Sequence, residues 1–122
     1  MHRKAILVVE DNLAIAEVIT LALNDDPTYH ATSVSTGAAA LAQMAAAGAD
    51  LILLDINLPG LSGFALHDIL RRDPAHIALP ILFMTAGDHA REFFRRGVRT
   101  WLAKPFDLED LVARVDRLLR PA

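Results

Sequence analysis

The chain contains no cysteine, which excludes disulfides, a thiolate nucleophile and a zinc–thiolate site. Its histidines lack metal-binding spacings such as His-Glu-x-x-His, so we expect most of them to be solvated. Long hydrophobic runs are also missing. The first apolar run, Ala5–Val9, is ended by Glu10 and Asp11 and is too short for a signal-peptide core or a membrane span. A cytoplasmic protein is therefore the default expectation. The formal net charge of −3 argues against direct nucleic-acid binding.

What the chain does contain is enough apolar material for a packed core. Its 122 residues fit one compact domain, and 53% of them are apolar. A domain of this size buries roughly two-thirds of the surface that its unfolded chain exposes. Because no linker, repeat or change of composition divides the sequence, we expect residues 1–122 to form a single domain.

Apolar runs and helical patterns alternate along the chain. The short runs are Ala5–Val9, His30–Val34, Leu51–Leu54, Ile81–Met84 and Trp101–Leu102. The first, third and fourth are nearly continuous, which is typical of strands buried on both faces, whereas the more polar second run indicates an edge strand. Helical periodicity predicts helices over 13–23, 38–47, 64–72, 90–96 and 108–119. The alternation predicts an α/β fold with a doubly wound parallel sheet and right-handed crossovers.

Two helices can be predicted in more detail. Asn12 and Asp107 stand where they can cap the first and the last helix. The apolar face expected for the first helix consists of Ile15, Val18, Ile19 and Ala22. Both helices should therefore begin at defined residues and pack through one apolar face.

Polar residues follow the apolar runs at the points where the predicted strands end. Glu10 and Asp11 follow the first run, Asp55 the third and Thr85 the fourth, and Lys104 comes shortly after the fifth. The carboxyl ends of parallel strands lie along one edge of a sheet, and ligands bind outside that edge. We therefore expect residues that are far apart in the sequence to meet at one rim.

The residue types at this rim suggest phosphoryl chemistry. Three carboxylates repel one another unless a cation lies among them, and their oxygen ligands suit Mg²⁺. A carboxylate such as Asp55 can act as the nucleophile in aspartyl-phosphate formation, with the metal neutralising the phosphoryl group. The Thr85 hydroxyl and the Lys104 ammonium can each hold another phosphoryl oxygen.

Several short motifs occur in the order and near the spacing found in one family. They are Val8-Val9-Glu10-Asp11-Asn12, Leu54-Asp55-Ile56-Asn57-Leu58-Pro59-Gly60, Ser62-Gly63, Met84-Thr85-Ala86 and Lys104-Pro105-Phe106. Over essentially its whole length, the chain resembles the response-regulator receiver domains (CheY-like) of two-component signalling systems. The resemblance implies a five-stranded parallel sheet of order 2-1-3-4-5 flanked by five helices.

The resemblance also implies a phosphorylation site and a metal site. Asp55 would accept a phosphoryl group from a phosphohistidine on a sensor histidine kinase or a histidine phosphotransfer protein. The Mg²⁺ ligands implied are Glu10 through water, Asp11, Asp55 and the carbonyl oxygen of Asn57. Such a protein catalyses its own phosphorylation and dephosphorylation but is no conventional enzyme, and it signals by phosphorylation-dependent binding of a downstream protein.

Other site residues take their expected roles from the same resemblance. Thr85 and Lys104 would bind the phosphoryl group, and the bond before Pro105 would be cis. Trp101 occupies a position where the family usually has Tyr or Phe. It is either a switch residue that moves inward with Thr85 or a partly buried aromatic anchor, and both interpretations stay open.

Alternative functions remain at this point. A degenerate receiver that is never phosphorylated would act as a constitutive interaction module. A small-molecule phosphatase of the haloacid type is disfavoured, because it needs a second carboxylate in an Asp-x-Asp motif, and Asp55-Ile56-Asn57 lacks it. We expect a receiver without an output domain, either stand-alone or excised from a longer protein.

Two stretches depart from the family pattern. The region Gly87–Glu92 is shorter than in most receivers, so the loop and first turn of the fourth helix are trimmed. Arg99 and Thr100 stand where receivers attached to winged-helix DNA-binding domains often carry acidic residues. The basic residues of this region are Arg91, Arg95, Arg96 and Arg99. They indicate either a surface for an acidic protein partner or a solvated helix face.

Overall fold

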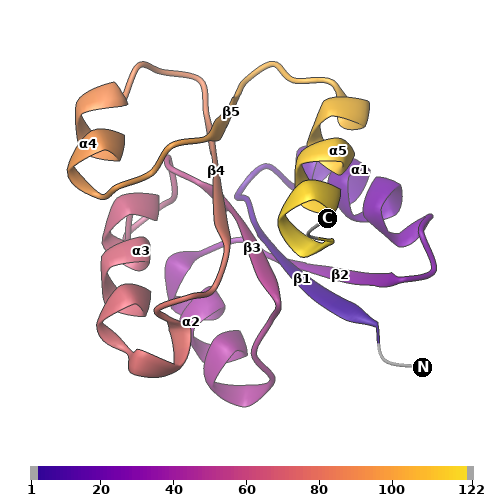
Figure 1. Ribbon diagram of the computed structural model, residues 1–122, viewed down its shortest axis with the longest axis horizontal. Coiled ribbons are helices and arrows are strands. Elements are labelled where there is room, and N and C mark those ends of the chain that lie inside the picture. The colour runs from indigo at the N-terminus through magenta and orange to yellow at the C-terminus, as the bar shows by residue number, and fades with distance from the viewer. Residues whose placement is uncertain (1–2, 121–122) are drawn as a thin grey trace.

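The computed structural model describes residues 3–120, in which five parallel strands form one sheet of order β2-β1-β3-β4-β5 (Figure 1). The strands are β1 (Lys4–Val9), β2 (Tyr29–Val34), β3 (Leu51–Asp55), β4 (Ile81–Thr85) and β5 (Trp101–Ala103). Each is one residue longer than the apolar run that predicted it. The predicted strand order and the edge position of the second strand are confirmed.

Helices cover both faces of the sheet (Figure 1). They are α1 (Leu13–Asn24), α2 (Gly37–Ala46), α3 (Gly63–Arg72), α4 (Ala90–Arg95) and α5 (Leu108–Leu119), with a short 3₁₀ helix, η1 (Pro74–His76), before β4. Helices α1 and α5 lie on one face, and α2, α3 and α4 lie on the other. Within residues 3–120 no helix combines the length and the apolar composition that crossing a membrane requires.

The alternation of side chains along the strands divides the core into two layers. In β1, Ile6 and Val8 pack with the layer of α1 and α5, whereas Leu7 and Val9 pack with the layer of α2, α3 and α4. All residues of the central strand β3 are buried, which explains its continuous apolar run. Each fully buried aliphatic side chain stabilises the fold by about 1.5–3 kcal/mol. This core fixes the strand ends that carry the polar rim.

The two predicted helix caps have different outcomes. Asn12 caps α1 as predicted, because its side-chain oxygen accepts a hydrogen bond from the Ile15 amide at 3.1 Å. Asp107 occupies the cap position of α5, but its side chain makes no capping hydrogen bond. The Asp107 carboxylate is exposed and can stay hydrated, while its backbone carbonyl accepts the Leu111 amide at 3.0 Å. The predicted position of the cap is confirmed, but Asp107 does not form a side-chain capping bond there.

The apolar face predicted for α1 is only partly correct. Ala16, Ile19 and Leu23 are the buried residues of the helix. Val18 is 47% exposed, because it lines a hollow between α1 and α5 instead of facing the sheet. Leu108 at the start of α5 lines the same hollow. The two helices therefore leave an open apolar groove between them.

Candidate functional site

The carboxyl ends of the strands bring polar residues together at one edge of the sheet. Glu10 and Asp11 follow β1, Asp55 ends β3, Thr85 ends β4 and Lys104 follows β5. Glu10, Asp55 and Thr85 are 1%, 3% and 1% exposed, which is unusual for polar side chains. Burial of so many polar groups at one strand edge marks a site rather than a solvated surface.

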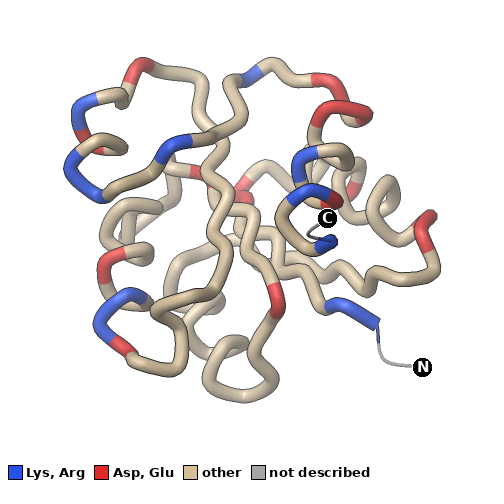
Figure 2. The backbone as a smooth tube through the Cα atoms, in the orientation of Figure 1, with Lys and Arg blue, Asp and Glu red and all other residues tan. Residues whose placement is uncertain are grey.

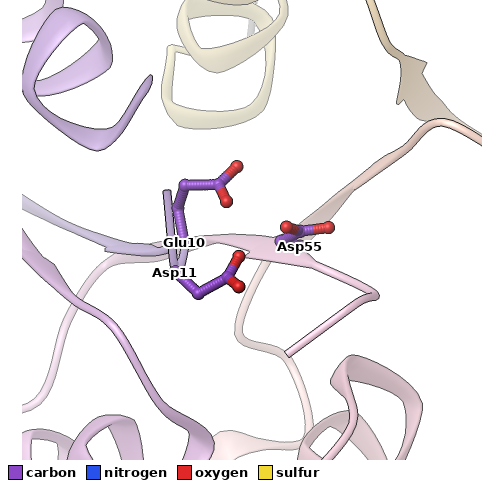
Figure 3. Close-up of side chains that lie close together, drawn as sticks. All are labelled: Glu10, Asp11 and Asp55. Atoms are coloured by element: carbon purple, nitrogen blue, oxygen red, sulfur yellow. The ribbon is translucent and has the colours of Figure 1, made fainter. Parts of the chain in front are cut away.

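Three carboxylates form a cluster at this edge. One oxygen from each of Glu10, Asp11 and Asp55 lies within 4.8 Å of the others, and Figure 3 shows the three side chains around a common space. The cluster offers the oxygen donors that Mg²⁺ prefers, and an outer carboxylate can reach this ion through one of the water molecules that Mg²⁺ keeps. A cation here would relieve the mutual repulsion of the carboxylates.

Lys104 forms hydrogen bonds to two of these carboxylates. Its Nζ atom lies 2.8 Å from Oε1 of Glu10 and 3.2 Å from Oδ2 of Asp55. Burial acts to lower the pKa of Lys104, but the hydrogen bond to Glu10 and the charge of Asp55 outweigh it, so the pKa is raised. The Lys104 amide also donates to the Thr85 carbonyl at 2.7 Å, and the following peptide bond to Pro105 is cis. The Lys104 ammonium group therefore stays protonated and in contact with the buried Asp55 carboxylate.

Backbone groups next to the site are held by the same carboxylates. The Asn57 amide donates to Oδ1 of Asp55 at 3.1 Å, and the Asn12 amide donates to Oε2 of Glu10 at 3.1 Å. The first bond fixes the turn after β3, which carries the Asn57 carbonyl. Glu10 and Asp55 therefore each use one oxygen for a backbone amide and the other for Lys104.

Gly63 determines how closely α3 approaches the end of strand β3. A Cβ atom at this position would lie 2.5 Å from the Asp55 carbonyl oxygen and 2.7 Å from the Ile56 Cα. Only glycine permits this approach, because backbone atoms cannot move aside as a flexible side chain can. Ser62-Gly63 is one of the motifs that carry the family resemblance, but the sequence analysis assigns Gly63 no role. The feature that could have indicated this role is a glycine directly after the residue that caps α3.

The Thr85 hydroxyl is turned toward the loop between β4 and α4. Its Oγ1 accepts the Gly87 amide at 3.0 Å and donates to the Gly87 carbonyl at 3.3 Å. Both bonds reach Gly87, the first residue of the Gly87–Glu92 stretch that the sequence analysis expects to be short. The hydroxyl would have to leave at least the carbonyl bond to contact a group on Asp55.

Trp101 lies half-buried in an aromatic cluster rather than free at the surface. Its ring stacks on Phe93 of α4 with a centroid distance of 4.3 Å and an interplanar angle of 25°. Phe93 in turn packs edge-on against Phe64 at 5.6 Å and in a tilted arrangement against Phe83 at 5.3 Å. Strand β5 is thereby coupled to α4 through ring contacts.

The four arginines between Arg91 and Arg99 do not form one uniform basic face. Arg96 binds Asp68 with two hydrogen bonds of 2.9 Å, reaches Glu92 at 2.8 Å, and lies 4.5 Å from the centre of the Phe64 ring. The hydrogen bond from Arg96 lowers the pKa of Asp68 to about 2. Only Arg91, Arg95 and Arg99 remain exposed.

Two side chains in this region have surroundings that the sequence did not indicate. Phe94 on α4 is 85% exposed, although nothing in the pattern distinguished it from the buried Phe93. His67 on α3 is only 5% exposed, contrary to the expectation for most histidines, with Nδ1 at 3.0 Å from Oδ1 of Asp68. Burial lowers the pKa of His67, and its ring packs beside Phe83.

Comparisons with known proteins agree with this arrangement. The family model "Response regulator receiver domain" matches residues 6–116. The sensory transduction protein RegX3 of Mycobacterium tuberculosis is 34% identical over 119 residues, which are 95% of this chain and 51% of RegX3. The regulator RpaA of Synechocystis, described as a DNA-binding dual master transcriptional regulator, is 34% identical over 94% of this chain and 48% of its own length.

Solved structures show the same fold. The chemotaxis response regulator CheY4 of Vibrio cholerae superposes with a TM-score of 0.87 at 29% identity, covering 96% of this chain and 99% of CheY4. The chain spans about half the length of the curated relatives named above. The match of the family model over most of the chain, together with this structural likeness, shows that the chain belongs to the response regulator receiver domain family.

Proposed function

We propose that this receiver domain is a phosphoacceptor switch whose acceptor is Asp55. The observation that carries the proposal is the buried Asp55 carboxylate, with a charged Lys104 ammonium at 3.2 Å and the Glu10 and Asp11 carboxylates beside it. A nucleophile, a cation for the phosphoryl oxygens and a set of metal ligands meet at one strand end. The phosphodonor would be a phosphohistidine on a sensor histidine kinase or a histidine phosphotransfer protein.

We assign Mg²⁺ binding to Glu10, Asp11 and Asp55, together with the carbonyl of Asn57. Their oxygen donors fit this ion, and Glu10 would act through a water molecule. Bound Mg²⁺ would neutralise charge on the transferring phosphoryl group. Asp11 is the one exposed member of the carboxylate cluster.

The transfer itself needs an oxygen of Asp55 in line with the bond that breaks. One carboxylate oxygen attacks the phosphorus, the P–N bond to the donor imidazole breaks, and the imidazole leaves with the electron pair and takes up a proton. Lys104 and the Thr85 hydroxyl would each hold an oxygen of the transferred group. Attack of water on the same phosphorus later releases phosphate and restores Asp55. Receiver domains are not conventional enzymes, and here the domain would act on itself.

Phosphorylation would be read out through the fourth helix and the fifth strand. Thr85 would exchange its bond to the Gly87 carbonyl for one to the phosphoryl group, and the β4–α4 loop would move with it. Because Trp101 stacks on Phe93, a movement of α4 changes the surroundings of Trp101. This coupling supports phosphorylation-dependent binding of a downstream protein.

Treatment with phosphoramidate tests the proposal, because this small donor carries the same type of P–N bond as phosphohistidine. With Mg²⁺ the protein should gain the mass of one phosphoryl group, and alkali should release it, as expected for an acyl phosphate. Chelation of the metal should prevent the gain. A protein that stays unmodified with Mg²⁺ present would instead be the constitutive interaction module.

A further inference from the structure

Helix α4 presents an exposed aromatic side chain between two arginines. Phe94 has the highest exposed fraction, 85%, of the large hydrophobic side chains in residues 3–120. Arg91, three positions earlier, and Arg95, the next residue, are also exposed, and Figure 2 shows the positive charges on this helix. Arg96 does not add to this surface, because Asp68 and Glu92 balance its charge. We call Arg91, Phe94 and Arg95 the α4 knob.

The groove between α1 and α5 is complementary to the α4 knob, because it combines apolar walls with negative charge. One of its hollows has a volume of about 740 Å³ and apolar walls that include Val18, Leu21 and Val112. The charged residues that line this hollow are Asp25, Glu109 and Asp116, and none of its lining residues is basic. Leu21 is 64% exposed, so the described part of the chain leaves much of this wall uncovered. We call this hollow the acidic groove.

The knob and the groove lie at opposite ends of the molecule. Figure 1 places α4 at one end of the longest axis, with α1 and α5 toward the other end. One copy therefore cannot use its own knob to fill its own groove, but two copies in line can. Lys104 is not among the residues that line the acidic groove, so the proposed contact does not use this residue.

We propose that this chain associates head to tail, with the α4 knob of one copy in the acidic groove of the next. The Phe94 ring would cover the apolar wall of the groove, and Arg91 and Arg95 would face its carboxylates. Aromatic and arginine side chains are the residues that most often anchor interfaces. Opposite charges then set the orientation in which the two surfaces meet.

The charges disfavour the two symmetric arrangements. A contact of knob with knob would bring Arg91 and Arg95 of both copies together, and a contact of groove with groove would bring carboxylates together. Like charges oppose both arrangements. A head-to-tail contact leaves a free knob at one end and a free groove at the other, so it can repeat. With one aromatic anchor, the dissociation constant should be on the order of 100 µM.

Sedimentation velocity of the unphosphorylated protein tests this proposal. The average sedimentation coefficient should rise with protein concentration at low salt. The rise should shrink strongly at high salt, because salt screens exposed charges. Phe94→Ser in the knob and Leu21→Lys in the groove should each weaken association about tenfold or more. Both side chains are largely exposed, so the variants should fold, and circular dichroism checks this.

A mixture of the two variants gives the sharpest outcome. The intact groove of the Phe94→Ser protein can accept the intact knob of the Leu21→Lys protein, but the resulting pair cannot extend. An equimolar mixture should therefore restore association and stop at a dimer. Ile77→Ser, which alters another exposed side chain, should associate like the wild type. Arg95→Glu should weaken association as Phe94→Ser does.

Three results would overturn the proposal. The first is a wild type that stays monomeric at low salt throughout a concentration series bracketing the expected dissociation constant. The second is undiminished association of either single variant, which would indicate a symmetric contact. The third is a mixture that remains monomeric. The proposal does not rest on phosphorylation of Asp55, so its failure would leave the phosphoacceptor assignment untouched.

Discussion

The Lys104 ammonium lies 3.2 Å from Oδ2 of Asp55, although the two residues are 49 positions apart and β4 separates their strands. The contact exists because the parallel sheet aligns its carboxyl ends at one edge. The lysine balances part of the negative charge of the carboxylate cluster. A group transferred to Asp55 would therefore form within reach of a cation that is already in place.

Mg²⁺ should raise the melting temperature of the wild-type protein, because a ligand that binds only the folded state stabilises it by mass action. Asp11→Asn should weaken this effect at least several-fold. It should also leave the metal-free protein as stable as the wild type or slightly more stable, since one repulsive charge is removed. Differential scanning fluorimetry with a Mg²⁺ titration measures both effects. Unshifted curves at saturating Mg²⁺ would contradict the metal assignment.

Gly63→Ala should destabilise the fold by about 3 kcal/mol, because the new methyl group overlaps backbone atoms of Asp55 and Ile56. Gly60→Ala is a matched control. It has open space around it but a positive φ of 74°, so it should cost only about 1 kcal/mol. Urea unfolding compares the two variants. Equal losses of stability would show that the close approach of α3 to β3 does not restrict residue 63 more than a positive φ restricts residue 60.

Asp68→Asn should destabilise the protein by about 1 kcal/mol at neutral pH, since Arg96 loses a charged partner. The value is modest because the Asp68 side chain is 39% exposed. The pKa of Asp68 in the folded state is about 2, below its ordinary value of 3.8. The stability that Asp68 contributes is therefore fully present above pH 3.8 and is lost as the pH falls toward 2. Wild type and variant should thus converge in acid. Asp107→Asn, which removes no capping bond, serves as the control.

Much of this arrangement could be predicted from local sequence patterns. Buried strands leave nearly continuous apolar runs, and the rim residues stand at or shortly after the ends of these runs, so the sequence predicts that Asp55 and Lys104 belong to one site. The surroundings of Trp101 and Arg96 could not be predicted in this way. They depend on contacts between distant segments, such as Arg96 with Asp68, which leave no periodic signal. The burial of Phe93 and the exposure of Phe94 could not be predicted either, because a shift of one position on a short helix decides which ring is buried.

Beryllofluoride with Mg²⁺, which mimics a phosphoryl group, should change the fluorescence of Trp101. The reason is that Trp101 stacks on Phe93, so a movement of α4 alters its surroundings. It is the only tryptophan, so the signal reports this position alone. Asp55→Asn should abolish the change. Unaltered emission and quenching, with binding of the mimic shown by an independent method, would leave Trp101 as a static aromatic anchor.

Intact-mass measurement after treatment with acetyl phosphate and Mg²⁺ tests the acceptor assignment most directly. The wild-type protein should gain the mass of one phosphoryl group, and Asp55→Asn should gain none, because the only carboxylate that lies against Lys104 at the end of β3 has been removed. Full labelling of the Asp55→Asn protein would contradict the account, because it would place the phosphorylated residue elsewhere.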